Sequence, residues 1–356
     1  MTKKLLLIQA ARAIVPLLVV LLHTSQFSAK YFDYRFLGMT DIPYSGGVDF
    51  FFVLSGFMLY YVFHQDFGKK EKFKAFLLGR LLRIYPVYWC ILACIVPIYF
   101  LVPDYGVGYE TQPWVIVKSF LLFPQEHNPV LGVAWSLVYT VFYYLVFSLL
   151  IGLPPWLSRS LIALWLLITA CAALQIVRLE PFLLRFMFNA EFLKFALGAF
   201  TAHAIMNYSF RFGLPAAAAG IIGFPLCWLN YAYSWFPLDL SVGYTVFSIL
   251  TILGLSSLDQ KKQITLPRFI HHLGSASYAI YLTNQPAISV LSKLFHAIHL
   301  PDYVSRPVSA SLLIAGAILA GSLTHLFVEK PLTSQLKRRF LASSARTGLM
   351  RSSSAA

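Results

Sequence analysis

The chain of 356 residues is 58% apolar and only 12% charged, and it has a formal net charge of +14 at pH 7. A soluble protein of this length has about twice that share of charged residues, so the composition excludes a soluble globular protein, a disordered chain and a disulfide scaffold. It predicts an all-α polytopic membrane protein. Basic cytoplasmic segments explain the positive charge better than a nucleic-acid partner does.

Ten apolar stretches are long enough to cross a bilayer as helices of about 20 residues. They lie near residues 5–27, 46–64, 87–103, 133–153, 160–177, 183–206, 213–230, 238–257, 269–291 and 308–329. The shorter run 114–123 is expected to form an interfacial helix within a loop. Residues 1–333 are interpreted as one membrane domain, and 334–356, rich in serine, alanine and arginine, as a disordered cytoplasmic tail.

The distribution of lysine and arginine orients these ten spans. With both termini in the cytoplasm, 19 of the 28 Lys and Arg residues lie in cytoplasmic segments, six lie in outer loops and three lie within spans. Basic residues collect on the cytoplasmic side of membrane proteins. Counting 114–123 as a further crossing would put Lys261 and Lys262 outside, so the sequence favours ten spans with cytoplasmic ends.

Ionisable residues within a membrane are costly and usually functional. In chain order the informative ones are Arg12, His23, Asp49, Glu191, Lys194 and Glu329. Arg12 and His23 lie on the first span, eleven residues apart, which places them on one helix face about 16 Å from each other. A neutral imidazole there is suited to accept a proton from a hydroxyl as a general base. The alternative is a structural histidine bonded to a neighbouring helix.

Asp49 opens the second span, at a predicted depth similar to that of His23. Its carboxylate is placed to orient the imidazole, as the third group of a catalytic triad does. The alternative is a carboxylate that is simply favoured by the positive end of the helix dipole.

Two further features lie on the predicted cytoplasmic side. Arg80 and Arg83 share one face of an amphipathic stretch, residues 69–86, and two guanidinium groups can clamp a phosphate or pyrophosphate. The alternative is a helix that lies on anionic lipid headgroups, and this stretch taken on its own favours that alternative over a phosphate site. Glu329, at the end of the last span, is expected either to pair with one of the arginines or to be an ordinary terminus, with Pro331 ending the helix.

Six segments in this order resemble the motifs of the acyltransferase 3 family of integral membrane acyltransferases, over residues 6 to 333. They are Arg12 with His23, Gly47-Val48-Asp49-Phe50-Phe51-Phe52-Val53-Leu54-Ser55-Gly56-Phe57, Arg80-Leu81-Leu82-Arg83-Ile84-Tyr85-Pro86, Trp135-Ser136-Leu137, Ser277-Tyr278-Ala279-Ile280-Tyr281-Leu282 and Glu329-Lys330-Pro331. The resemblance implies an enzyme of the bacterial inner membrane. It would transfer an acyl group, usually acetyl, from cytoplasmic acyl-CoA to a hydroxyl of an extracytoplasmic polysaccharide or lipid-linked oligosaccharide. Compact exopolysaccharide O-acetyltransferases are the most similar members.

The same resemblance implies roles for individual residues. His23 would be the catalytic residue with Asp49 nearby, and Arg12, Arg80 and Arg83 would bind acetyl-CoA, which is a substrate and not a permanent cofactor. Further candidates are Trp135, Ser136, Tyr144, Asn284 and Glu329. No metal site is expected.

Two positions depart from the family pattern. Thr140 occupies a position where members often have Glu, and Asn284 one where they often have His. Neither side chain can act as an acid or base near neutral pH. A catalytically weakened relative is therefore an alternative to an active enzyme. A glycan or lipid transporter is another, although the repeated halves common in transporters are not visible.

Overall fold

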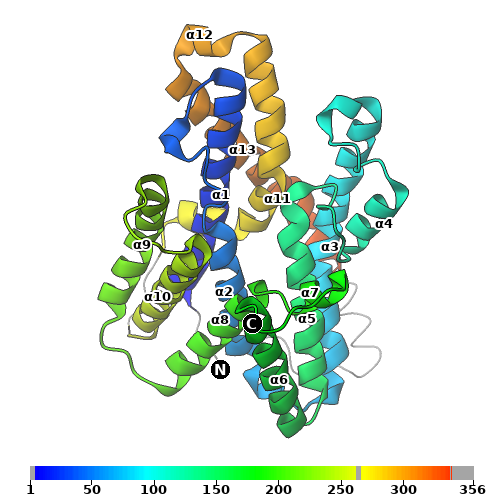
Figure 1. Cartoon of the computed structure of the whole chain (residues 1–356), viewed down its shortest axis with the longest axis vertical. Coiled ribbons are helices and arrows are strands. Elements are labelled where there is room, and N and C mark those ends of the chain that lie inside the picture. Colours follow the sequence, from blue (N-terminus) through cyan, green and yellow to red (C-terminus); the bar gives the residue numbers. More distant parts are fainter. Residues whose placement is uncertain (1–4, 262–265, 337, 339–356) are drawn as a thin grey trace.

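The computed structural model describes residues 5–261, 266–336 and 338, and this part of the chain is helical, without a β-strand (Figure 1). The α-helices are α1 (Leu6–Phe32), α2 (Gly47–Phe63), α3 (Lys70–Leu101), α4 (Pro113–Leu121), α5 (Trp135–Gly152), α6 (Pro155–Ala173), α7 (Phe182–Met187), α8 (Glu191–Asn207), α9 (Gly213–Tyr233), α10 (Leu240–Lys261), α11 (Arg268–Ala297), α12 (Leu300–Val304) and α13 (Arg306–Thr324). Short 3₁₀ turns are η1 (Phe36–Gly38), η2 (His64–Asp66), η3 (Pro103–Tyr105) and η4 (Gly132–Ala134), and η5 (His325–Glu329) is a π-helix. The predicted all-α class is confirmed, whereas the expected tail 334–356 lies almost entirely outside the described residues.

Eight helical segments in the described ranges are long and apolar enough to cross a membrane. They correspond to eight of the ten expected spans. The expected span 183–206 is instead broken into α7 and α8, because the chain turns at Asn189 and the Asn189 side chain accepts a hydrogen bond from the Glu191 N–H at 2.9 Å. The other expected span that is not among these eight, 269–291, lies within α11, whose 30 residues include many polar side chains. The count of ten and the cytoplasmic ends stay predictions.

One expected helix end is wrong, and two segments that the sequence analysis named separately form one helix. Residues 69–86 and the span 87–103 form one continuous helix, α3, which passes through Pro86. The sequence separated them because charges fill the first half and apolar residues the second. Pro331 does not end the last helix either, because the helical segment Arg306–Leu336 continues beyond it. The π-helical turn η5 ends at Glu329, with Lys330 between it and Pro331, and such a bulge changes the hydrogen-bond ladder just before the point where a proline would otherwise interrupt it.

In Figure 1, α1 runs upward beside α11 and α13, while α3, α5 and α4 form the opposite side of the molecule. We call the end at which α1 begins the lower end, and the end at which it finishes the upper end. The start of α1 is held by Asp259, near the end of α10, whose carboxylate accepts hydrogen bonds from the Leu7 N–H at 2.9 Å and the Ile8 N–H at 3.3 Å. This carboxylate from another helix therefore caps the helix that carries both Arg12 and His23.

Helices α2 and α8 cross in close backbone contact in the centre of the molecule. A Cβ atom on Gly56 of α2 would overlap the carbonyl oxygen of Phe195, and one on Gly198 of α8 would overlap that of Val53. Small residues allow this close approach between membrane helices. The contact fixes the position of Asp49, on the first turn of α2, relative to the first turn of α8.

Candidate active site

The three arginines that were expected to bind the donor come together in the lower half of the molecule. Arg12 of α1 lies within electrostatic range of Arg80 and Arg83 of α3 and of Tyr144 of α5. The Arg80 guanidinium lies over the rings of Phe63, at 4.9 Å from its centroid, and Tyr144, at 6.0 Å. Among the described residues, no Asp or Glu forms a salt bridge with any of the three. The cluster is therefore a concentration of positive charge that could bind an anion.

Glu329 lies beside this cluster but does not form an ion pair with an arginine, which was one of its two expected roles. Its Oε2 accepts a hydrogen bond from Nδ1 of His325 at 2.8 Å, and both side chains are 13% exposed. The nearby Arg12 interacts with Glu329 only through the longer-range field. Both residues of this pair lie in the π-helical turn η5, four positions apart, and therefore on one side of the helix. The three guanidinium groups thus stay available to a ligand.

Two tyrosines of α11 connect the candidate motifs of other helices. The hydroxyl of Tyr278 donates to the Ile84 carbonyl at 2.8 Å, beside Arg83. The hydroxyl of Tyr281 lies 2.7 Å from both Ser136 Oγ and the Val133 carbonyl. The motif around residues 277–282 therefore links α11 to α3 and to the start of α5. Sequence reasoning noted this motif without assigning these bonds.

His23 lies in the upper half of α1 and is half-buried. Its Nδ1 is 3.2 Å from Gln26 Oε1. With the Gln26 oxygen as acceptor, Nδ1 carries the proton and Nε2 has the lone pair that a general base needs. Gln26, one turn further along the helix, was missed in the sequence, although its spacing of three residues from His23 is a usable signal.

The expected pairing of Asp49 with His23 is wrong. In the described structure Asp49 Oδ1 accepts hydrogen bonds from Lys194 Nζ of α8 and from Ser241 Oγ of α10, the latter at 3.3 Å. The reason is the register of α2: Gly47 is the residue that packs against Val15 and Val19 of α1. A residue two positions later is rotated by about 200° around the helix axis, so Asp49 points away from α1.

Asp49, Lys194 and Glu191 form a buried ionic network. The Lys194 ammonium also contacts both carboxylate oxygens of Glu191, at 2.8 and 2.9 Å. Asp49 is 3% exposed and Lys194 is 7% exposed. Because such charges are stable inside a protein only when they are paired, the network ties α2 to α8 structurally.

Tyr44, in the loop before α2, lies next to this network. Burial raises the pKa of its phenol, and the carboxylates of Asp239 and Asp49 raise it further. The phenol is therefore neutral at physiological pH. Gly46, in the same loop, has φ +76° and lies directly against the ring of Tyr244, so only a glycine fits this turn.

The two positions that depart from the family pattern differ in their environments. Thr140 is buried, and its hydroxyl donates to the Ser136 carbonyl at 2.8 Å within α5. Asn284 is also fully buried; its Nδ2 donates to the Tyr281 carbonyl, but its Oδ1 has no partner in the described chain. Thr140 is thus fully satisfied, whereas Asn284 leaves an acceptor open in the centre of the bundle.

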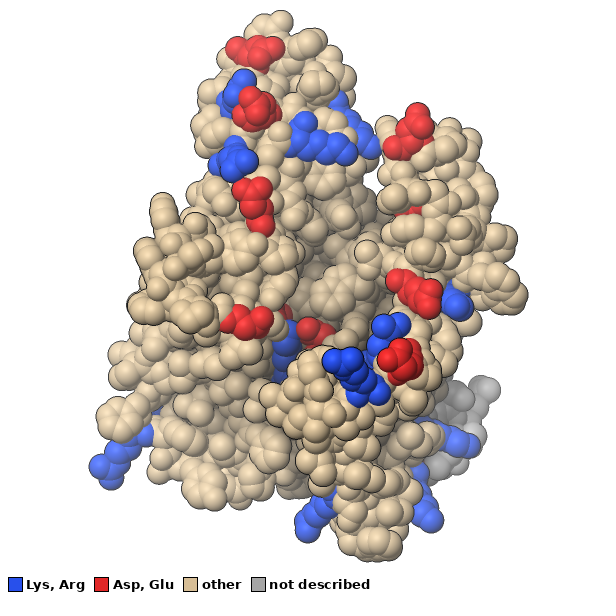
Figure 2. All heavy atoms as spheres, in the orientation of Figure 1, with Lys and Arg blue, Asp and Glu red and all other residues tan. Residues whose placement is uncertain are grey.

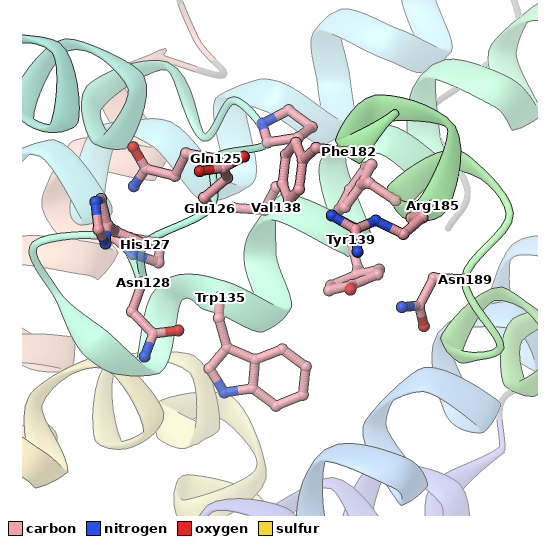
Figure 3. A pocket seen from close by; sticks show the side chains of 13 residues that line it. Gln125, Glu126, His127, Asn128, Trp135, Val138, Tyr139, Phe182, Arg185 and Asn189 are labelled. Atoms are coloured by element: carbon pink, nitrogen blue, oxygen red, sulfur yellow. The ribbon is translucent and has the colours of Figure 1, made fainter. Parts of the chain in front are cut away.

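A pocket of about 640 Å³ lies at the upper end of α5, between the loop 124–129 and α7 (Figure 3). Its lining contains the aromatic residues Trp135, Tyr139, Phe182 and Phe186 and the polar residues Gln125, Glu126, His127, Asn128, Arg185 and Asn189. Of these, the sequence analysis named only Trp135. Tyr139 lies on α5, one turn after Trp135, and the others lie in the loop 124–129, in the short helix α7 or just beside it, where no periodic pattern marks them.

Comparison with known proteins gives two matches. The profile of a family described as an acyltransferase domain matches residues 6–326. The exopolysaccharide production protein ExoZ of Rhizobium meliloti (strain 1021) is 27% identical over 316 residues, which cover 83% of this chain and 91% of that protein. No solved structure has significant similarity to the chain.

Proposed function

The chain belongs to this acyltransferase family, and on that premise we propose that it transfers an acetyl or other short acyl group from acyl-CoA to a hydroxyl of an extracytoplasmic polysaccharide. The observation that carries the proposal is the arrangement on α1. A cluster of three guanidinium groups lies around Arg12 at its lower half, and His23 lies about 16 Å higher on the same helix. One helix thereby connects an anion-binding group with a candidate base.

In this proposal the lower end faces the cytoplasm. On the face shown in Figure 2, described acidic side chains gather in the middle and upper parts, and the lower edge carries only basic ones, as the distribution of charge in membrane proteins favours. The phosphates of acyl-CoA would bind to Arg12, Arg80 and Arg83. The extended pantetheine arm would then carry the thioester upward, toward His23.

At the upper site, Nε2 of His23 takes the proton from the acceptor hydroxyl while the oxygen of that hydroxyl attacks the thioester carbonyl. The carbon–sulfur bond breaks, the proton passes from the imidazolium to the leaving thiolate, and the products are an O-acyl ester and free CoA. A transient acyl-imidazole on His23, formed first and then attacked by the hydroxyl, gives the same products. Gln26, and not Asp49, is the residue that holds the ring in either route.

The polysaccharide acceptor is supported by the name of ExoZ, an exopolysaccharide production protein. The bacterial inner membrane as the site of action is part of the proposal. Acetyl as the acyl group is likewise part of the proposal.

The test uses purified full-length protein in lipid nanodiscs with radiolabelled acetyl-CoA and a fractionated glycan pool. We expect label in a glycan fraction, and we expect His23→Ala to lower the transfer rate by about 10²–10⁴-fold while CoA binding is retained. The matched control is His299→Ala, an exposed histidine at the upper end, which should transfer normally. Full transfer by folded His23→Ala protein would disprove the mechanism. Absence of CoA binding by the unaltered protein would disprove acyl-CoA as the donor.

A further inference from the structure

The pocket beside α5 adjoins a second hollow of about 260 Å³. The two share the residues Gln125, Glu126, His127 and Phe182. The second hollow adds Trp114 and Lys118 of α4 to the lining. A concave surface therefore extends from α7, across the loop 124–129, to α4, and its elongated form suits a chain better than a single small molecule.

The lining combines flat aromatic rings with planar polar groups. Sugar rings present apolar C–H faces, which pack on aromatic side chains, and hydroxyl rims, which bind to amide, carboxylate and guanidinium groups. Gln125 contributes a specific requirement: its Nε2 donates to Ser119 Oγ at 3.3 Å, while its buried Oε1 has no partner in the described structure. A buried acceptor is normally hydrogen-bonded, and a rotation of this amide toward the pocket would let a ligand hydroxyl bind to it.

The charges of the larger pocket balance. It contains one cation, Arg185, and one carboxylate, Glu126, both exposed. Neither forms a salt bridge with a described residue. In Figure 3 they lie on opposite sides of the ring of Phe182. Because the pocket has no net charge from these groups, it is suited to an uncharged sugar, toward which both groups act as hydrogen-bonding partners.

The turn that joins the pocket loop to Trp135 lies near the depth of His23. Helices α1 and α11 run in parallel at a constant offset, since Gly274 lies against Gln9 and His296 contacts Tyr31. The same offset places Gln285 of α11 about one turn below His23. Gln285 is in turn the residue that packs on Gly132, in the turn η4 that leads from the pocket loop to Trp135.

We propose that these two hollows bind an extended segment of the acceptor polysaccharide, with an uncharged sugar ring against Trp135, Tyr139 and Phe182 in the larger one. This assignment rests on the proposed function, because it names the acceptor site of the same reaction. It adds the class of sugar recognised and the residues that recognise it, away from the arginine cluster and from His23.

The test measures binding of neutral hexasaccharides, namely β-1,4-, β-1,3- and α-1,6-linked glucans, to the full-length protein in nanodiscs by calorimetry. A hexagalacturonate of equal length serves as the anionic probe. The pocket variants are Phe182→Ala and Arg185→Gln. Their matched controls are Phe236→Ala and Arg178→Gln, which alter exposed residues that line neither hollow. We expect at least one neutral glucan to bind. Its Kd should rise about 10-fold or more in both pocket variants and be unchanged in the controls.

Other results would overturn this inference. Absence of binding by all neutral glucans, or tighter binding of the galacturonate that weakens steeply with salt, would exclude an uncharged sugar. Binding that is seen in detergent but lost in nanodiscs rich in phosphatidylglycerol would assign the hollows to lipid headgroups.

The same variants separate this inference from the proposed function. If the protein transfers acetyl to a polysaccharide with an acceptor KM that Phe182→Ala and Arg185→Gln leave unchanged, the acceptor site is wrong and the function stands. If glucan binding responds to the pocket variants but the unaltered protein transfers no label, the binding site stands and the function fails.

Discussion

Replacing Lys194 by Met tests whether the buried ionic network holds α2 and α8 together. Met fills a similar volume, but it removes the ammonium group that contacts both Asp49 and Glu191. The variant leaves two neighbouring carboxylates without a cation, one of them only 3% exposed. We therefore expect a large loss of stability from a single substitution that creates no cavity.

The magnitude follows from the burial of the pair. Removing one partner of a buried ion pair costs about 3–5 kcal/mol, because the other charge stays desolvated. Asp49→Asn should cost less, since Lys194 keeps its two contacts with Glu191. Adding Asp49→Asn to Lys194→Met should recover part of the loss, because it removes one of the unpaired charges. The double variant would then show a coupling free energy of about 0.5–3 kcal/mol.

The assay is equilibrium unfolding in bicelles. It measures the free energy of unfolding of the unaltered protein, the two single variants and the double variant. Lys70→Met, which removes an exposed lysine at the start of α3, is the matched control and should change stability by less than about 0.5 kcal/mol. If Lys194→Met were as stable as the unaltered protein, or if the double variant lost the sum of the two single losses, the network would not stabilise the fold.

Two further predictions concern the donor cluster and the central helix contact. Arg83→Gln should raise the KM for acetyl-CoA about 10–100-fold, as loss of a charged hydrogen bond does, without changing the acceptor KM. Steady-state kinetics measure both constants, and Arg159→Gln, which alters an exposed arginine at the lower end, is the control. An unchanged KM for acetyl-CoA in Arg83→Gln would contradict the prediction. Gly56→Ala should cost about 1–3 kcal/mol or more in unfolding experiments, because the added Cβ overlaps the backbone of α8. Gly79→Ala, where a Cβ meets nothing within 4 Å, should be neutral or stabilising by up to about 1 kcal/mol, and equal losses at both glycines would refute the packing argument.

The helical class and most of the spans could be predicted because apolar length is a local property of the sequence. The break before α8 could not, because it depends on one asparagine side chain that accepts a hydrogen bond from the first N–H of the next helix. The continuity of α3 was missed for the opposite reason: a change from charged to apolar residues does not interrupt the backbone hydrogen bonds of a helix. Composition thus predicts where a helix can be buried, and local hydrogen bonding decides where it ends.

The candidate site was predictable in its residue types but not in its pairs. The structure brings Arg12, Arg80 and Arg83 together, yet their binding of acyl-CoA stays a prediction. Asp49 and Lys194 were both recognised as costly membrane charges, but they lie 145 positions apart. Periodicity fixes the face of a residue only relative to its own helix, so it could not show that Asp49 faces α8 and not His23.

The carboxylate of Asp259 has a consequence for the order in which this enzyme is made. It binds the backbone of Leu7, 252 positions earlier in the chain. At about 5–20 residues per second, a ribosome needs roughly 10–50 s to synthesise the intervening chain. During that time α1, which carries Arg12 and His23, lacks the acceptor that finally fixes its start. A nascent chain arrested before α10 would therefore carry His23 on a helix whose start is uncapped, and only a chain synthesised as far as Asp259 can hold that helix in its final position.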